Sequence, residues 1–477
     1  MIRTRCVLLA ALCWPFIFCG PAPADEPRWS EAAYGVSLKP PPGSLRLESR
    51  ETAWADPRGF TIGFEIITSD VPVTLEDVAA NTVVQMGFAN ASPRLIDADG
   101  QTLTRKPRQE RIAERPGIRM WFRVEPQDEA QPAWHYGQAI VMLEPYAAAV
   151  LNVRATAEAA DAGRQAFDRV LESLHVPLAV ELEAARSERV AAGDNWLQTV
   201  TPDDLRAALP VDRRYRLVFG DRDVGYLQVG HTADPAVLGR LGHEPPGTLV
   251  RVRRRQMLGG RAMDTLTTLF VADDGRRETW DTKSTVRPEG ANAATPGLPR
   301  RGGPEPLTWA ETGVRGDQRL GNAADARTVN TLTVVHESPP DTADARRIEA
   351  HERFAGRSRG GELRGRVRTN QWVAPDRAYL SQVHVLALPV LLPNEAATYH
   401  FSAYHPPTGR PGLRTVEVIP QPDGSRVVLD RPTSRLTAVR TTLDADGNLV
   451  EQLLPNGTRI LPATPEELAT IWGTPGN

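Results

Sequence analysis

Hydrophobic and polar residues alternate along residues 25–177 in a way that predicts β-strands, with two helical segments among them. The strand-like segments are residues 34–38, 59–67, 93–103, 117–124, 136–144 and 147–155. Thr74 and Asp77 form a capping-box pattern ahead of apolar residues at helical spacing, which predicts a first helix. A second helix is predicted over 166–176 and ends at Pro177. This order is typical of an α+β domain in which an antiparallel sheet carries two helices.

Residues 178–210 show a different pattern, which predicts a helical connector. The segment is charged and rich in alanine, without the alternation of the preceding strands. It leads into Thr201-Pro202-Asp203-Asp204, where a threonine cap, a proline and first-turn acids indicate the start of a short helix. The same device, Thr464-Pro465-Glu466-Glu467, occurs near the end of the sequence. Shared capping chemistry explains the two copies at least as well as an internal duplication.

Extended segments return in residues 211–477 and predict a β-rich second domain. They are residues 215–219, 224–229, 247–258, 262–272, 276–286, 379–392, 397–405, 413–419, 426–430, 435–444, 449–454 and 458–461. The dipeptides Asp274-Gly275, Asp446-Gly447 and Asn456-Gly457 indicate tight turns between strands. About a dozen strands without long helices predict an antiparallel curved sheet or barrel-like domain. Two polar loop insertions, 287–306 and 338–366, interrupt it.

One segment of the second domain, VLALPVLL (385–392), is apolar on both faces. A strand with this composition is typical of the centre of a sheet that is covered on both sides. The alternative is a strand that lines an enclosed apolar cavity. The first interpretation makes the segment part of an ordinary core, and the second makes it part of a ligand site.

The first 24 residues predict an export signal. Arg3 and Arg5 precede an apolar run over 6–19, and Ala22-Pro23-Ala24 supplies a cleavage site of small residues. Cleavage after Ala24 predicts a periplasmic or secreted protein. A retained membrane anchor is the alternative, although the apolar run is shorter than the roughly 20 residues that span a bilayer.

Cleavage would change the chemistry available to the mature chain. All three cysteines lie in the signal, so the mature chain would have neither disulfides nor a catalytic thiolate. It would carry 54 basic and 59 acidic residues, a net charge of −5, against −3 for the full sequence. This balance argues against a general nucleic-acid-binding protein. No apolar stretch after residue 25 is long enough for a transmembrane segment.

Three segments of the first region, YGVSLKPPPG (34–43), TLEDVAAN (74–81) and AFDRVLESLHV (166–176), resemble the PsbP and DcrB-type exported domains. The resemblance implies an α+β fold and an accessory or binding role, and it implies no catalytic residues. The predicted curved sheet of 211–477, with its apolar segment, is similar to the half-barrel of periplasmic carriers such as LolA. That similarity implies a hydrophobic ligand.

A serine-hydrolase pattern occurs at Gly356-Arg-Ser358-Arg-Gly360. A nucleophile elbow of this kind requires a buried strand before the first glycine and a helix after the second. Ser358 instead lies between two arginines in the polar insertion 338–366, with no helical repeat after it. We therefore assign no catalytic residue to this pattern.

Other candidate sites have simpler interpretations. His384, His400 and His405 are the candidate metal ligands. His400 and His405 are five residues apart, so on a regular strand their side chains point to opposite faces of the sheet. The loop 444–448 departs from the calcium pattern because its glycine comes too early, and a hairpin turn explains it. Arg251, Arg253 and Arg255 share one face of a strand, which is typical of a solvated outer face or, alternatively, of a site for an anionic polymer or a lipid headgroup. The sequence therefore assigns no metal, cofactor or catalytic residue.

Three functional hypotheses remain at this stage. The favoured one is a non-enzymatic exported protein of two domains that acts as a binding or cell-envelope accessory module, with an apolar ligand or an envelope protein as its partner. The second is a carrier that holds a hydrophobic ligand or lipid in the curved sheet. The third is a hydrolase.

Overall fold

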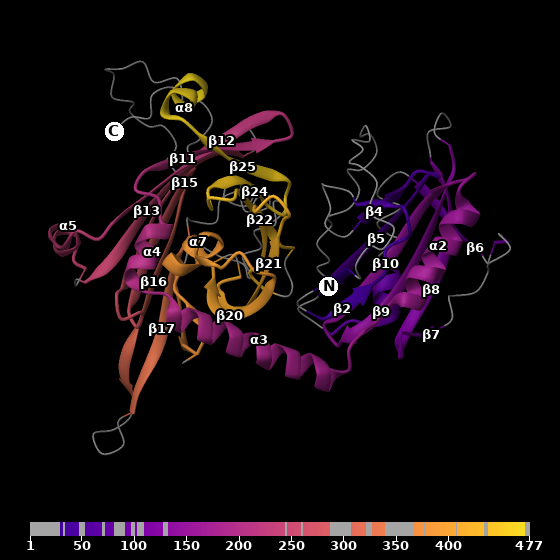
Figure 1. Cartoon of the computed structure of the whole chain (residues 1–477), viewed down its shortest axis with the longest axis horizontal. Coiled ribbons are helices and arrows are strands. Elements are labelled where there is room, and N and C mark those ends of the chain that lie inside the picture. The colour runs from indigo at the N-terminus through magenta and orange to yellow at the C-terminus, as the bar shows by residue number, and fades with distance from the viewer. Residues whose placement is uncertain are drawn as a thin grey trace. The chain divides into compact units, whose positions relative to one another are not determined.

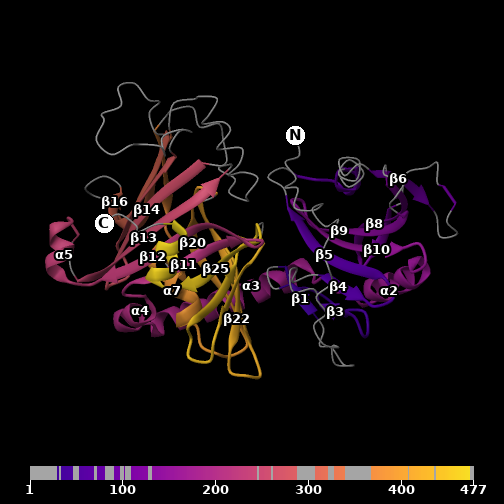
Figure 2. The same cartoon turned by 90° about the horizontal axis from the view of Figure 1, so that it is seen from above.

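Two compact units, Met1–Ala184 and Ala185–Asn477, make up the chain, and each has its own antiparallel sheet (Figures 1 and 2). The structure is a computed structural model. It describes residues 29–31, 34–46, 53–68, 72–80, 91–96, 101–102, 109–126, 132–243, 246–258, 261–286, 307–320, 327–338, 367–375, 377–406, 408–433 and 437–472. The predicted signal, residues 1–24, lies outside them.

The first unit is built on an eight-stranded sheet of order β3-β4-β5-β10-β9-β8-β6, with β7 paired to β8. The strands are β3 (Leu45–Arg46), β4 (Ala53–Asp56), β5 (Phe60–Thr68), β6 (Ala91–Ile96), β7 (Gln109–Ile112), β8 (Arg115–Pro126), β9 (Trp134–Glu144) and β10 (Ala147–Thr156). A separate pair joins β1 (Trp29–Glu31) and β2 (Val36–Leu38). The strands predicted at 59–67, 117–124, 136–144 and 147–155 are therefore confirmed.

Helices cover both faces of this sheet. Helix α2 (Ala160–Ser173) lies on one face (Figure 2), where its Phe167 and Val170 are buried in the core. Helical residues 75–80 pack Leu75 and Val78 against the other. Asp77 donates its backbone N–H to Oγ1 of Thr74 at 3.1 Å, which confirms the predicted cap. The α+β prediction for the first region thus holds, although α2 begins six residues earlier than predicted and the predicted turn at 99–100 lies outside the described residues.

Short capping motifs start the helices that follow. Helix α3 (Ala179–Thr199) contains the boundary between the units, and α4 (Pro202–Ala208) follows it. Thr201 and Asp204 form a reciprocal capping box, as predicted. Thr464 and Glu467 do the same for α8 (Pro465–Trp472). Helix α5 (Pro235–Arg240) was not predicted, although Asp234 and Pro235 repeat this cap-and-proline device.

The second unit contains a fifteen-stranded sheet. Its order is β18-β17-β16-β15-β14-β13-β12-β11-β25-β24-β23-β22-β21-β20-β19, and every pair is antiparallel except β19–β20. The strands are β11 (Arg213–Phe219), β12 (Arg222–Thr232), β13 (Gly247–Leu258), β14 (Arg261–Ala272), β15 (Glu278–Val286), β16 (Leu307–Leu320), β17 (Arg327–Glu337), β18 (Arg368–Val373), β19 (Tyr379–Leu380), β20 (Ala397–His405), β21 (Arg410–Pro420), β22 (Arg426–Arg431), β23 (Val439–Leu443), β24 (Leu449–Leu453) and β25 (Thr458–Ala463). The hydrophobic pattern does not reveal β16, β17 and β18.

The segment 385–392 is not a strand, and this prediction was wrong. It belongs to helix α7 (Gln382–Leu391), which starts at Ser381, whose Oγ accepts the backbone N–H of His384 at 3.2 Å. A short apolar run fits a buried strand and a buried helix equally well, so periodicity does not separate them. Figure 1 shows α7 in the bend of the sheet, between the side that carries β13–β17 and the side that carries β20–β22. There Val383 and Ala387 pack into the main core of the unit together with Leu205 of α4.

Candidate functional site

The histidines singled out by sequence do not form a metal site. His384 lies in the first turn of α7 rather than on a strand, and its Nδ1 is 2.7 Å from Oγ of Ser381. His400 and His405 lie on β20, and Nδ1 of His405 is 3.3 Å from Oγ1 of Thr408. Within the described part of the chain, no group of three or more His, Cys, Asp or Glu residues is placed to hold a metal ion.

The other candidate sites from the sequence are the serine pattern, the loop 444–448 and the arginines of β13. Ser358 falls outside the described residues. Asp444 Oδ1 accepts the backbone N–H groups of Asp446 and Asn448 at 3.0 and 2.7 Å, so this loop is a side-chain-stabilised hairpin turn. Arg251 and Arg253 are exposed on β13, which fits either interpretation of this arginine stripe, whereas Arg255 forms an ion pair with Asp264 at 2.7 Å.

A buried charged network, absent from the sequence predictions, crosses the inside of the second sheet. Its first centre is Glu278 on β15, which is 1% exposed. Its carboxylate accepts the hydroxyl of Tyr379 at 2.8 Å and the backbone N–H of Gln382 at 2.9 Å. Arg315 of β16 lies 3.4 Å away and packs its guanidinium over the Tyr379 ring at 4.4 Å. Burial raises the pKa of Glu278, and Arg315 together with the two hydrogen bonds opposes that increase.

The second centre is Glu311 on β16. One carboxylate oxygen accepts the indole N–H of Trp280 at 2.9 Å, and the other accepts the Tyr404 hydroxyl at 3.2 Å. That second oxygen also lies 3.3 Å from Nδ1 of His336 on β17. Each carboxylate oxygen of Glu311 is therefore held by protein groups, as buried charges require.

These two centres join parts of the sheet that share no backbone ladder. Tyr379, Gln382 and Tyr404 belong to the β19–α7–β20 segment, whereas Glu278 and Glu311 lie on β15 and β16. The rings of Trp280 and Tyr404 lie 5.1 Å apart, which brings β20 over β15. The network thus fixes α7 and its flanking strands inside the bend of the sheet. We call this network the seam; its members are Glu278, Trp280, Glu311, Arg315, Tyr379 and Tyr404. Both carboxylates are already paired with protein groups, which is typical of a structural role.

The seam depends on a glycine. A Cβ atom at Gly313 would lie 2.0 Å from the Trp280 ring. We expect Gly313→Ala to displace that ring and to cost about 1–3 kcal/mol of stability or more, because the packed core has no room for the methyl group. Urea denaturation and near-UV circular dichroism would measure this effect. Gly316→Ala on the same strand is the control, since its nearest neighbour would be 3.9 Å away. Equal effects of the two variants would contradict the prediction.

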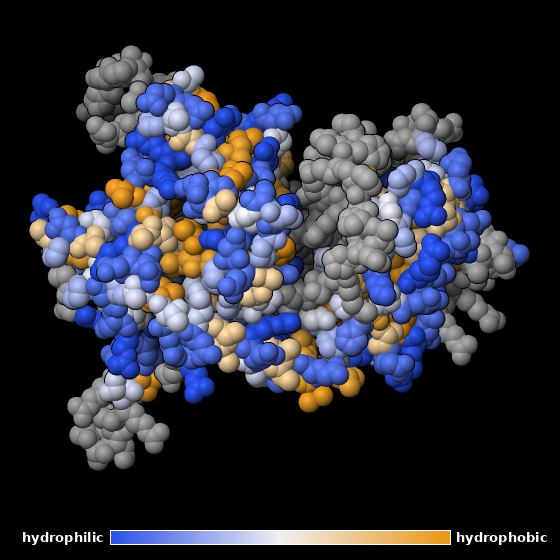
Figure 3. Space-filling view, in the orientation of Figure 1, coloured by the Kyte–Doolittle hydropathy of each residue, from blue (hydrophilic) through white to orange (hydrophobic). Residues whose placement is uncertain are grey.

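Helix α7 also presents an apolar surface outward. Leu386 and Val390, one turn apart, are 36% and 37% exposed, and Val385 and Pro389 beside them are half-buried. No charged residue occurs between Gln382 and Leu391, and burial lowers the pKa of His384 to about 4, so its imidazole is neutral near pH 7. Figure 3 shows hydrophobic surface over the part of the unit that holds α7. We call Val385, Leu386, Pro389 and Val390 the α7 ridge.

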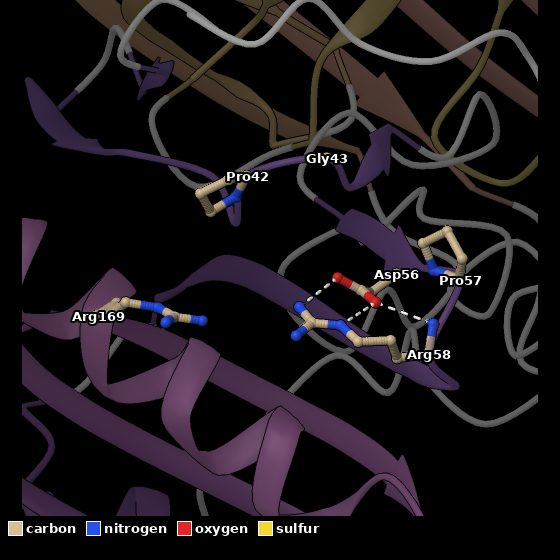
Figure 4. A pocket seen from close by; sticks show the side chains of 6 residues that line it. All are labelled: Pro42, Gly43, Asp56, Pro57, Arg58 and Arg169. Carbon is tan, nitrogen blue, oxygen red and sulfur yellow. Dashed lines mark hydrogen bonds and ion pairs between the residues drawn. The ribbon is translucent and has the colours of Figure 1, made fainter.

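A separate hollow of about 480 Å³ lies on the first unit. It is open to solvent and is lined by Pro42, Gly43, Asp56, Pro57, Arg58 and Arg169 (Figure 4). Asp56 and Arg58 form a two-point ion pair, with N–O distances of 2.8 and 2.9 Å. The Arg58 bonds lower the pKa of Asp56, so that carboxylate stays charged at neutral pH.

Comparisons with known proteins add little to this description. No family model matches the chain, and neither does any curated protein. The solution structure of cyanobacterial PsbP (CyanoP) from Synechocystis sp. PCC 6803 aligns with 34% of this chain and 98% of its own, at 16% sequence identity and a TM-score of 0.25. Similarity at this level defines neither the family nor the function, and the LolA-like resemblance of 211–477 stays a prediction.

The fold itself defines only a broad class, a β-rich protein with its antiparallel sheets in two groups. Among the helices that the structure describes, none combines the length and the apolar composition needed to cross a membrane.

Proposed function

We propose that this chain is an exported, non-enzymatic binding protein whose second unit binds a hydrophobic ligand along the α7 ridge. The observation that carries the proposal is an uncharged helix with an exposed apolar face, held inside the bend of a large sheet. An exposed apolar stretch is costly unless something covers it, so such surfaces are typical of interaction sites.

The chemistry of the ridge favours a hydrocarbon chain as the occupant. The side chains of the ridge offer neither a charge nor a hydrogen-bonding group. The Arg426 guanidinium beside them donates to the carbonyls of Pro389 and Val390 at 3.3 and 2.9 Å. The ridge spans residues 385–390, about 9 Å of helix, which gives a short hydrocarbon segment continuous contact. The adjacent carboxylates, Glu278 and Glu311, are held by the seam and support a structural role better than a catalytic one.

Binding of a neutral apolar fluorophore, N-phenyl-1-naphthylamine, tests the proposal. We expect Leu386→Asp to weaken binding about tenfold, mainly because the aspartate places a charge in an apolar contact; the leucine side chain is 36% exposed, so its own lost burial contributes the smaller part. Val314→Asp is the matched control, since Val314 is 49% exposed and lies on β16 instead of α7. Equal losses in both variants, or no binding by the unchanged protein, would contradict ridge binding.

Native mass spectrometry of the purified protein separates the two forms of the proposal. A bound lipid that Leu386→Asp removes would identify a carrier. Fluorophore binding without any co-purified apolar species would instead favour a docking module for a hydrophobic segment of another envelope component.

A further inference from the structure

We propose that the hollow on the first unit binds a small organic anion, with its oxyanion group between Arg58 and Arg169 and its apolar part against Pro42 and Pro57. This site lies apart from the α7 ridge in sequence and chemistry, and the proposal does not depend on ligand binding by the second unit.

The side chain of Arg58 is held in place by Asp56. Asp56 accepts the Nε and Nη2 hydrogens of Arg58, so that side chain is tied to its own turn at two points, and Asp56 also accepts the backbone N–H of Arg58 at 2.9 Å. The Asp56 side chain is 3% exposed, whereas that of Arg58 is 53% exposed. The ring of Phe60 supports the guanidinium from below at 5.1 Å. The buried carboxylate thus fixes the arginine, and the rest of its donor fork faces the hollow.

Arg169 supplies a second cation. It projects from α2 toward the Asp56–Arg58 pair (Figure 4). Its side chain is exposed, and in the described part of the chain it makes no ion pair or hydrogen bond. Two guanidinium groups and one carboxylate give the hollow a net charge of +1. Two arginine forks suit the paired oxygens of a carboxylate or a phosphate.

The size of the hollow favours an organic anion over a simple ion. Pockets that hold small molecules typically have volumes of about 300–1,000 Å³ and combine apolar walls with a few polar groups. The hollow has about 480 Å³ and is flanked by Pro42 and Pro57. An aromatic or aliphatic body attached to the oxyanion would contact these proline rings.

Isothermal titration of the full chain with benzoate, phenyl phosphate and inorganic phosphate tests the proposal. We expect benzoate or phenyl phosphate to bind at least several-fold more tightly than inorganic phosphate, and the preferred one of the two identifies the oxyanion. We expect Arg169→Ala to weaken that binding about tenfold, the typical effect of losing one charge-assisted hydrogen bond. Arg58→Lys should also weaken it, because lysine keeps the charge and loses the fork.

Arg111→Ala is the matched control. Arg111 is an exposed arginine of β7, at the other edge of the sheet from β4 and β5, and should leave binding unchanged. Thermal unfolding of each variant would verify that the first unit stays folded. Equal binding by Arg169→Ala and the unchanged protein, equal weakening by Arg111→Ala, or a preference for inorganic phosphate would overturn the proposal.

Discussion

Replacing Glu278 with alanine is expected to lower the free energy of unfolding of the second unit by about 3–5 kcal/mol, the usual cost of removing one partner from a buried ion pair. The change leaves Arg315, 7% exposed, without its carboxylate. It also removes the acceptor of the Tyr379 hydroxyl and of the first backbone N–H of α7. Urea denaturation followed by tryptophan fluorescence would measure the loss, because Trp280 lies in the same network.

Two controls make this prediction specific. Glu451→Ala breaks an exposed ion pair with Arg459 and should cost about 1 kcal/mol or less. The double variant Glu278→Leu/Arg315→Met removes both charges together and should recover much of the loss, because a buried pair is often no better than apolar side chains of similar volume. A Glu278→Ala cost no larger than that of Glu451→Ala would show that the seam contributes little to stability.

The seam also explains why part of the sheet escapes prediction from the sequence. Strand β16 (Leu307–Leu320) turns Trp309, Glu311, Gly313 and Arg315 to the interior, where an ordinary strand would place aliphatic residues. Glu311 and Arg315 belong to the buried network. Because such polar residues occupy interior positions, β16 lacks the alternation of apolar and polar residues by which strands are recognised. The strands of the first region carry aliphatic and aromatic interiors, so their pattern is clear.

Helix caps and tight turns follow from local chemistry and were predictable. Thr201 and Asp204 complete their capping box within four residues, and the turn at Asp446-Gly447 is made by the loop itself. The buried network has no local signature, because Glu278 and Tyr379 are 101 residues apart. Only the paired strands and α7 bring them together. The segment of α7 was predicted to be a strand for a related reason. Its apolar residues are buried by strands that are distant in the sequence, so the local pattern does not separate a buried helix from a buried strand.

Acid should destabilise the second unit through His400, which is completely buried on β20. Neither ring nitrogen has a hydrogen-bond partner in the described part of the chain. Burial lowers the pKa of His400 to about 4, and Arg189 and Arg186 of α3 lower it further toward that value. The unfolded chain, with a histidine pKa of about 6.5, binds more protons in this window. The stabilising contribution is therefore present above pH 6.5 and is lost as the pH falls toward 4.

The size of this effect follows from the shift. A change from about 6.5 to about 4 corresponds to about 3 kcal/mol of stability lost by pH 4. We expect His400→Leu to remove about that much of the pH dependence in urea denaturation between pH 7.5 and 4. At pH 7.5 this variant should be as stable as the unchanged protein or more so, because it replaces a buried polar ring without partners by an apolar side chain. His384, with a pKa also lowered to about 4 by burial, contributes in the same direction and remains in the variant.

The location of His400 predicts which contact acid weakens first. A Cβ atom on Gly193 of α3 would lie 2.4 Å from the His400 carbonyl oxygen, so the helix backbone packs directly on β20. Trp196 of the same helix lies 5.5 Å from the ring of Phe401. A proton on His400 would place a third positive charge beside Arg186 and Arg189 at a fully buried position. Hydrogen exchange at pH 5 should therefore rise in α3 before β13–β15, and His400→Leu should abolish that difference, with the exposed His175→Gln as control. Uniform exchange across the unit would contradict this order.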